Sequence, residues 1–338
     1  MQLVDKSKLE AWLKINSYGI SPPISLKQFP GGQSNPTFLV TSKDGNFVLR
    51  KKPHGELVYG AHQIEREYRI MSQLFNSKVP VPKMITLCED DSVIGTPFFI
   101  MEYIQGKVFT NTLLPFENPE TRYKIYLSLS STLANLHLLD PNKYSLSRSL
   151  KSVNYIKRQI KIWKSQFEST QTEKIPEMDF LIGWIEENCP NETPKSFVHG
   201  DYRLGNIIFN PKNINISAVL DWELSTIGHP LADLAYSCLP WHIPIDEDNL
   251  FGIKGKNCKI EGIPEEEEYL ENYFSLTKTS FPSNWNFFLA FSFFRLASIS
   301  QGVYSRSISG NASSLAAKDY GERAKKFAYF GKQIILSK

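Results

Sequence analysis

Residues 197–209 read FVHGDYRLGNIIF, and this stretch decides how the rest of the chain is interpreted. A carboxylate, Asp201, stands five positions before a carboxamide, Asn206, and an apolar segment follows at once. The spacing raises the question of why two polar groups stand at the entrance of so apolar a segment.

The segment that follows predicts a small β-hairpin. IIF at 207–209 and SAVL at 217–220 are short apolar strands separated by the turn-rich link NPKNIN. In an antiparallel hairpin the start of the first strand lies beside the end of the second. We therefore expect Asn206, just before the first strand, and Asp221, just after the second, to be neighbours, with Asp201 one loop away.

Two carboxylates and one amide oxygen are the kind of ligand that Mg²⁺ prefers when it keeps most of its shell of water and phosphate. The alternative is a polar loop whose side chains only cap backbone groups, as Asn and Asp often do. The spacing D-x-x-x-x-N, together with an Asp delivered by a hairpin, favours the metal site.

The composition is that of a globular protein, with 41% apolar and 22% charged residues in a chain of 338. A chain of this length can bury one large core or two modest ones, so we expect one compact unit of two lobes. The formal net charge of +3 is too small to indicate a nucleic-acid or membrane partner. Nothing in the sequence specifies a protein partner.

Cysteine usage and the N-terminus indicate a cytoplasmic location. The four cysteines are scattered, with no C-x-x-C pair and no clustered His, so neither a zinc site nor a disulfide framework is expected. Residues 1–16 alternate charged and apolar side chains, as an amphipathic helix does, and lack the apolar core of a signal peptide. Residues 287–299 are shorter than the roughly 20 residues of a membrane span and contain Arg295, so they predict a core helix.

The order of predicted elements gives an α+β fold. Residues 24–50 and 96–106 have strand character, and a helix between them spans residues 62–75. The second part is mostly helical. Its predicted helices cover residues 121–138, 150–168, 175–188 and 264–274. We therefore expect an N-terminal lobe at residues 1–104 and a helical lobe at 105–338.

HGDYRLGN at 199–206 and LDWE at 220–223 resemble the catalytic and metal loops of the aminoglycoside phosphotransferase and choline-kinase-like family. These enzymes are relatives of protein kinases, whose loop reads H-R-D-x-x-x-x-N. The chain most resembles the kinase-like domains fused to acyl-CoA dehydrogenases. The resemblance extends in order through GGQSNPTF, VLRKKP, EREYRIM, VPVPK, HGDYRLGNIIF and VLDWELSTIGHPLADLA.

The resemblance implies a bilobal protein-kinase-like fold and transfer of a phosphoryl group from ATP, with GTP possible, in the presence of Mg²⁺. Asp201 would be the catalytic residue that accepts or orients the acceptor's proton, and Asn206 and Asp221 would hold the metal. Gly31, Gly32 and Ser34 would lie in the loop over the phosphates, where glycine permits close backbone approach. An ordinary hairpin turn is the alternative for the glycine pair.

The nucleotide-binding strand in the family carries a cation that pairs with phosphate. Arg50 matches that position, with Lys51 and Lys52 as alternatives, and Val48 would lie beneath the adenine. Glu67 would pair with the cation, and Glu65 is its competitor. FFIMEYIQG resembles the hinge, in which Glu102 C=O and Ile104 N–H would meet the adenine edge and Met101 would guard the pocket behind it.

Three further residues receive structural roles. Asp233 matches the residue that braces the catalytic loop in the family. His199 and His229 are expected to stabilise loops by hydrogen bonds rather than to act as bases.

The predicted acceptor is the hydroxyl of a small molecule. Between residues 141 and 167 the chain has seven basic residues and no acidic one. That bias favours an anionic acceptor over a polycationic aminoglycoside, although a solvated helix face is an alternative. Arg203, Glu223 and Arg295 are candidate acceptor-binding residues. The dehydrogenase-fused relatives suggest a hydroxyacyl-CoA or a hydroxy acid.

The alternatives to this function are an aminoglycoside-type antibiotic kinase and a catalytically silent nucleotide-binding scaffold. A scaffold would be expected to have lost Asp201, Asn206 or Asp221, and all three are present. A protein kinase is disfavoured because DWE replaces D-F-G and no A-P-E segment follows. A metal hydrolase would need a histidine cluster at ligand spacing, which the sequence lacks.

Overall fold

The structure is a computed structural model of the chain. It describes residues 4–16, 18–29, 35–53, 63–144, 154–191, 194–245, 247, 250–309 and 319–337. These residues form two compact units. The first comprises Met1–Val108 and Asn206–Leu224, and the second comprises Phe109–Gly205 and Ser225–Lys338. The first unit is a sheet with helices and the second is mainly helical, as an α+β fold requires.

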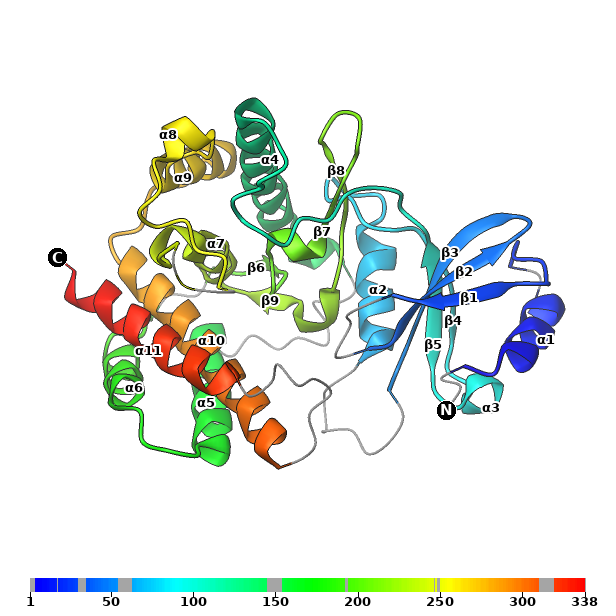
Figure 1. The fold of residues 1–338 in the computed structure, drawn as a ribbon, viewed down its shortest axis with the longest axis horizontal. Coiled ribbons are helices and arrows are strands. Elements are labelled where there is room, and N and C mark those ends of the chain that lie inside the picture. Colours follow the sequence, from blue (N-terminus) through cyan, green and yellow to red (C-terminus); the bar gives the residue numbers. More distant parts are fainter. Residues whose placement is uncertain are drawn as a thin grey trace. The chain divides into compact units, whose positions relative to one another are not determined.

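A five-stranded antiparallel sheet organises the first unit (Figure 1). Its strands, in spatial order, are β1 (Ser25–Gln28), β2 (Thr37–Ser42), β3 (Gly45–Lys51), β5 (Phe98–Glu102) and β4 (Met84–Cys88). β2 and β3 form a tight hairpin in which Ser42 pairs with Gly45. Gly45 has φ +132°, a backbone conformation that glycine adopts without steric cost.

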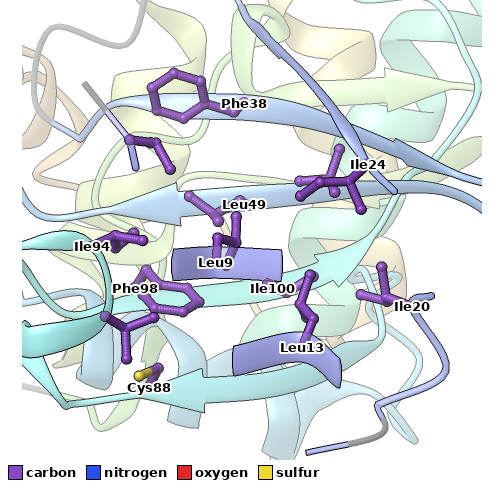
Figure 2. Packing of buried hydrophobic residues seen from close by; sticks show 13 residues of the cluster. Leu9, Leu13, Ile20, Ile24, Phe38, Leu49, Cys88, Ile94, Phe98 and Ile100 are labelled. Carbon is purple, nitrogen blue, oxygen red and sulfur yellow. The ribbon is translucent and has the colours of Figure 1, made fainter. Parts of the chain in front are cut away.

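One face of this sheet is covered by helix α1 (Lys6–Asn16) and the short helix α3 (Asp91–Ile94). Figure 2 shows the apolar core between them. Its labelled members are Leu9, Leu13, Ile20, Ile24, Phe38, Leu49, Cys88, Ile94, Phe98 and Ile100. Trp12 of α1 packs edge-on to Phe98 with ring centroids 5.1 Å apart. The predicted amphipathic helix near the N-terminus is thus present and contributes to this core.

Helix α2 (Ile64–Leu74) covers the opposite face of the sheet (Figure 1). Tyr68 of α2 meets Phe99 of β5 with ring centroids 6.1 Å apart. The buried face of α2 carries one charged residue, Glu67, which is 2% exposed. A carboxylate buried on an apolar helix face requires a partner on the sheet.

The predicted hairpin after the loop FVHGDYRLGN is confirmed. Strands β7 (Ile207–Phe209) and β8 (Ile216–Val219) pair antiparallel, with Ile207 opposite Val219. We call this hairpin the ribbon.

The ribbon belongs to the first unit, whereas the expected division at residues 104 and 105 placed it in the helical lobe. The reason is a set of contacts made at long sequence distance. The N–H of Val219 donates to Pro80 C=O at 2.8 Å, and Lys107 and Phe209 exchange two backbone hydrogen bonds of 2.9 and 2.8 Å. Gly106 lies so close to the ribbon that a Cβ there would stand 2.5 Å from Phe209 O.

The second unit is built on the long helix α10 (Trp285–Ile308). It packs against α5 (Tyr155–Thr170), α6 (Pro176–Glu187), α7 (Pro230–Cys238) and α11 (Tyr320–Leu336). The remaining elements are α4 (Pro119–His137), α8 (Cys258–Glu261), α9 (Glu266–Thr277) and the short strands β6 (Ser196–Val198) and β9 (Thr226–Gly228). β6 ends at the start of the stretch HGD, and β9 ends just before α7.

Among the described helices, α10 alone is long and apolar enough to cross a membrane. However, 78% of its apolar window is buried inside the structure, and Arg295 lies in its middle. α10 is therefore the core helix that the sequence predicts.

Candidate active site

In the first unit, Arg50 of β3 joins residues that are far apart in the sequence. Its Nε donates to Glu67 Oε2 at 2.9 Å, and one terminal nitrogen donates to Asp221 Oδ1 at 2.7 Å. The same nitrogen lies 3.9 Å from Glu223 Oε2. The ion pair that the sequence predicts between the strand cation and the α2 glutamate is therefore present.

The competing residues are engaged elsewhere. Lys52 Nζ pairs with Glu65 Oε1 at 2.5 Å, and Lys51 is fully buried. Arg50 and Lys51 point to opposite faces of the sheet because successive strand residues alternate. Strand alternation thus excludes Lys51 from the face towards α2. Of the two basic residues left on that face, Lys52 pairs with Glu65 and Arg50 pairs with Glu67 and Asp221.

The guanidinium of Arg50 lies near the carboxylates of Glu67, Asp221 and Glu223, and we call these four residues the Arg50 cluster. Burial lowers the pKa of Arg50, but attraction to Glu67, Asp221 and Glu223 outweighs this effect and leaves that pKa above its ordinary value. Burial raises the pKa of Glu67 to about 7, because the favourable effect of Arg50 is shared with the other two acids. The cluster therefore retains excess negative charge, which favours binding of a cation.

Asp221 owes its position to an unusual backbone conformation. Its φ is +66°, in the left-handed region that few residues other than glycine adopt. The fully buried Trp222 follows, and its indole N–H donates to Val219 O at 2.9 Å. This turn closes the end of β8 and directs the Asp221 carboxylate, whose side chain is 31% exposed, towards Arg50. Backbone strain of this kind is often found at functional sites.

Asn206 lies at the same end of the ribbon as Asp221, just before β7 begins. The N–H of Leu220 donates to Asn206 O at 2.8 Å, so Asn206 and Asp221 are neighbours across the ribbon, as expected. Asn206 is 6% exposed. Among the described residues, no three His, Cys, Asp or Glu side chains gather as a complete metal site. One amide and one carboxylate fit a Mg²⁺ ion that takes its remaining ligands from phosphate and water.

Glu223 contacts the end of the predicted phosphate loop. Asn35, which is fully buried, donates its side-chain N–H to Glu223 Oε2 at 3.1 Å. The loop residues Gly31, Gly32 and Ser34 lie outside the described residues. Glu223, expected to be an acceptor-binding candidate, is thus seen holding the base of that loop and contacting Arg50.

Two of the predicted adenine-binding residues, Val48 and Met101, lie on the α2 face of the sheet. Val48 is paired with Met101 across β3 and β5, and both side chains are buried. Glu102 Oε1 accepts from the N–H of Lys83 at 2.7 Å. Ile104 is half-buried beyond the end of β5. Val48 and Arg50, two residues apart, share the face that Met101 also occupies.

In the second unit, Asp233 of α7 holds the backbone of the stretch HGD. It accepts hydrogen bonds from the N–H groups of His199 and Gly200, the latter at 2.8 Å. Burial alone would raise the pKa of Asp233, but hydrogen bonds from His137 and Gly200 bring it below its ordinary value. Gly200 has φ +86°, so the turn needs glycine. This contact matches the bracing role expected of Asp233.

Asp201 emerges from this turn with its carboxylate 20% exposed. Tyr236 of α7 donates its hydroxyl to Asp201 Oδ1 at 2.7 Å. Arg203, which is 53% exposed, lies with Nε 3.3 and 3.2 Å from the two carboxylate oxygens. Tyr236 is a further residue of this site, and no sequence motif marks it, since a tyrosine among apolar residues usually packs in a core.

Arg295 is 7% exposed and lies between two aromatic rings. Its guanidinium carbon is 5.2 Å from the centre of the Tyr236 ring and 5.5 Å from that of Trp163. A terminal nitrogen donates to Gly200 O. Its Nε has no hydrogen-bond partner, and no ion pair links Arg295 to a carboxylate within the described ranges. Cation–π contacts therefore replace the counter-ion that a buried arginine usually has.

The two histidines form the contacts expected of structural residues. His199 Nδ1 accepts from the N–H of Asp201 at 3.2 Å, and His229 Nδ1 accepts from the N–H of Leu231 at 3.2 Å, capping α7. Burial, followed by the effect of His137, lowers the pKa of His229 to about 4. His229 is therefore neutral near pH 7.

The basic stretch at residues 141–167 is only partly described, since Arg148 and Lys151 lie outside the described residues. Lys164 pairs with Glu186 of α6 at 2.8 Å, while Lys157 and Lys161 are exposed. These contacts agree with the solvated helix face that was the alternative to an acceptor site.

Residues 25–259, which include every candidate residue except Arg295, match the phosphotransferase enzyme family. The chain belongs to this family. Acyl-CoA dehydrogenase family member 10 of Mus musculus is 43% identical over 326 residues, which are 96% of this chain and 30% of that protein. A putative aminoglycoside phosphotransferase from Ralstonia eutropha has a solved structure with 42% identity, a TM-score of 0.87 and 98% coverage of each chain. The predicted family resemblance is confirmed.

The kinase-like fold is also confirmed by a more distant structure. A thermostable mutant of aminoglycoside phosphotransferase APH(4)-Ia, in a ternary complex with ADP and hygromycin B, has a TM-score of 0.58 at 17% identity. It covers 96% of this chain and 98% of its own. At this identity the likeness concerns the fold alone. The chain spans less than a third of the mouse dehydrogenase family member, 30% of its length.

Proposed function

We propose that this phosphotransferase-family chain is an ATP- and Mg²⁺-dependent kinase that phosphorylates a hydroxyl of a small molecule. The observation that carries the proposal is the cluster in which Arg50 pairs with both Glu67 and Asp221. A strand cation tied to a helix glutamate and to a predicted metal ligand is the arrangement that phosphoryl transfer requires for charge neutralisation. The ADP complex of the distant aminoglycoside phosphotransferase supports use of a nucleotide. GTP remains an alternative to ATP.

In the proposed reaction, the acceptor's hydroxyl oxygen forms a bond to the γ-phosphorus of the nucleotide. The bond from that phosphorus to the oxygen bridging the β- and γ-phosphates breaks, and its electron pair leaves with the nucleoside diphosphate. The hydroxyl proton passes to the Asp201 carboxylate and then to solvent. The protein contributes mainly positioning, because little covalent chemistry is required of it.

We propose the remaining roles from the family resemblance, and the contacts of Arg50, Glu67, Asn206 and Asp221 support them. Asn206 and Asp221 would hold Mg²⁺, which when bound neutralises charge on the phosphates. Arg50, oriented by Glu67, would contact the phosphates, where its planar donors suit two oxygens at once. Val48, Met101, Glu102 and Ile104 would bind the base. Gly31, Gly32 and Ser34 would cover the phosphates.

The acceptor is proposed to be anionic or neutral, such as a hydroxy acid or a hydroxyacyl-CoA. Arg295 places a buried positive charge against Tyr236, whose hydroxyl contacts Asp201. A polycation brought to that carboxylate would meet like-charge repulsion, which disfavours the alternative of an aminoglycoside-type kinase. Arg203 would bind acceptor or phosphate, since its exposed pairing with Asp201 is easily exchanged.

We further propose a cytoplasmic location. All four cysteines are free thiols, as expected of an enzyme in a reducing compartment. Three of them, Cys88, Cys238 and Cys258, are buried.

The test is phosphoryl transfer from γ-labelled ATP with Mg²⁺ to a panel of hydroxy acids, hydroxyacyl-CoAs and aminoglycosides. Asp201→Asn should lower kcat by at least about 100-fold while leaving nucleotide affinity unchanged. Asp179→Asn is the matched control, because Asp179 lies on α6 with a half-exposed side chain. Wild-type turnover in Asp201→Asn would refute the role of Asp201. Transfer to none of the panel would refute the acceptor class.

A further inference from the structure

Helix α7 sends two side chains to the same short loop. Asp233 and Tyr236 are three residues apart and so lie on one helix face. Asp233 accepts from the backbone N–H groups of His199 and Gly200, whereas Tyr236 donates to the side chain of Asp201. One helix therefore controls both the path of the loop and the carboxylate that the loop presents.

Among the described contacts of Asp201, the hydrogen bonds from Tyr236 and Arg203 differ in quality. The Tyr236 hydroxyl lies 2.7 Å from Oδ1, a length typical of a strong O–H donor on a carboxylate. Arg203 lies at 3.2 Å or more and is 53% exposed. Exposed ion pairs of this kind contribute little, because solvent competes with them. Tyr236 is thus the fixed partner of Asp201, and Arg203 is the exchangeable one.

Arg295 fixes the Tyr236 ring from behind. Its guanidinium carbon lies 5.2 Å from the ring centre, and one of its nitrogens donates to Gly200 O, directly before Asp201. Trp163 covers the guanidinium at 5.5 Å from its own ring centre. Gly200, the residue before Asp201, is therefore held at its N–H by Asp233 and at its C=O by Arg295, while the same arginine contacts the tyrosine ring.

The hydroxyl of Tyr236 keeps its proton. Burial is the largest cause of a pKa far above the ordinary tyrosine value, and the negative charge of Asp201 raises it further, against the opposing effects of Arg295 and Arg203. Tyr236 therefore remains a hydrogen-bond donor near pH 7.

We propose that Tyr236 is a positioning residue for phosphoryl transfer, holding the Asp201 carboxylate in one rotamer while Arg203 exchanges with incoming ligands. This role rests on the proposed function, in which Asp201 receives the acceptor's proton. A carboxylate fixed in this way meets the acceptor hydroxyl in a single orientation, which is the main contribution that positioning makes to the rate.

Within the described part of the chain, charged and titratable groups reach Asp201 from its own loop, from α7 and from α10. Arg203 and His199 belong to its own loop, Tyr236 to α7, and Arg295 to α10 behind the tyrosine ring. Removing the tyrosine hydroxyl deletes a donor to the ionised form of Asp201. The pKa of Asp201 should therefore rise, because hydrogen bonds to a carboxylate favour its charged form.

The experiment compares Tyr236→Phe with wild type by two independent measurements. The first follows the Asp201 carboxyl carbon by NMR across pH in aspartate-labelled protein, with Asp201→Asn to assign the signal. We expect a pKa higher by about one unit. The second measures transfer to the acceptor, for which we expect kcat lower by about tenfold and the KM for nucleotide within twofold.

Tyr202→Phe is the matched control. Tyr202 directly follows Asp201 in the chain and is buried. Its hydroxyl donates to the backbone oxygen of Leu129 at 2.9 Å. Its removal deletes the same atom without removing a donor from a carboxylate. Both the pKa of Asp201 and kcat should remain at the wild-type values.

The two measurements separate this inference from the proposed function. An unchanged pKa of Asp201 in Tyr236→Phe overturns the inference, whatever the activity. A raised pKa with wild-type kcat overturns the positioning role. If the wild type phosphorylates no acceptor, the proposed function is refuted. A raised pKa of Asp201 in Tyr236→Phe would still support the contact between Tyr236 and Asp201.

Discussion

Asp221 in the first unit and Asp201 in the second are both loop carboxylates, but different chemistry holds each of them. Asp221 pairs with Arg50, a permanent cation that it shares with Glu67 and Glu223. Asp201 receives its short hydrogen bond from the neutral hydroxyl of Tyr236, and its pairing with the cation Arg203 is longer and exposed to solvent. A neutral donor orients a carboxylate without cancelling its charge, whereas a cation cancels it until another cation arrives. The difference suits a proton acceptor in one case and a metal ligand in the other.

The largest expected effect on stability comes from removing Arg50, the cation that pairs with Glu67, Asp221 and Glu223. Arg50→Met should lower the free energy of unfolding by about 3 kcal/mol, because it leaves Glu67 buried without its partner. Urea unfolding at pH 7 measures this value. The loss should shrink as the pH falls through 7, since Glu67 has a raised pKa and then takes up a proton.

Lys52→Met is the control for that substitution. Lys52 pairs with Glu65, and both side chains keep a fifth or more of their surface exposed. Its loss should therefore cost about 1 kcal/mol or less. Equal costs for the two variants would contradict the view that Arg50 holds a buried charge cluster together.

The next effect is stabilisation by bound nucleotide, which should differ between substitutions of Asp201 and Asp221. A non-hydrolysable ATP analogue with Mg²⁺, at about 100 times its Kd, should stabilise the wild-type protein by about 2.7 kcal/mol. Asp201→Asn should keep this stabilisation, whereas Asp221→Asn should lose most of it. A thermal-shift titration with and without Mg²⁺ measures both. The same response in both variants would remove the distinction between a metal ligand and a proton acceptor.

The smallest expected effect is the change of stability with pH that His229 of the second unit causes. His229 has its folded pKa lowered from 6.5 to about 4, so the unfolded chain binds more protons between these pH values. Its contribution to stability is complete above pH 6.5 and is lost as the pH falls towards 4. Between pH 7 and 4 the wild type should lose about 2 kcal/mol more than His229→Asn, whose amide can still cap α7. Urea unfolding at each pH measures the free energy of unfolding of both proteins. If this free energy changes with pH equally in the wild type and His229→Asn, His229 is not a buried neutral group.

The local parts of the candidate site were predictable from the sequence. The ribbon was found because two apolar runs flank a turn-rich link, and that alone makes Asn206 and Asp221 neighbours. β4 was missed because Pro80 and Pro82 precede it and obscure the strand pattern. The choice between the pairs Arg50–Glu67 and Lys52–Glu65 needed the structure, because both pairs have plausible spacing.

The parts that depend on long-range contacts were not predictable. The grouping of the ribbon with the first unit depends on hydrogen bonds to Pro80 and Lys107, more than a hundred residues earlier. Tyr236 gave no signal, because a tyrosine in an apolar helix is indistinguishable from core until its hydroxyl partner is seen. The buried position of Arg295 was suspected from its apolar helix, but its two aromatic neighbours were not.

The threading of the chain constrains how this protein can be divided or recombined. Because the first unit is assembled from Met1–Val108 and Asn206–Leu224, no continuous gene segment encodes it alone. A truncation after the sheet would discard the ribbon, and with it both predicted metal ligands. A chain threaded in this way can be transferred between longer proteins only as a whole, and the mouse relative aligns with 96% of the chain rather than with one unit.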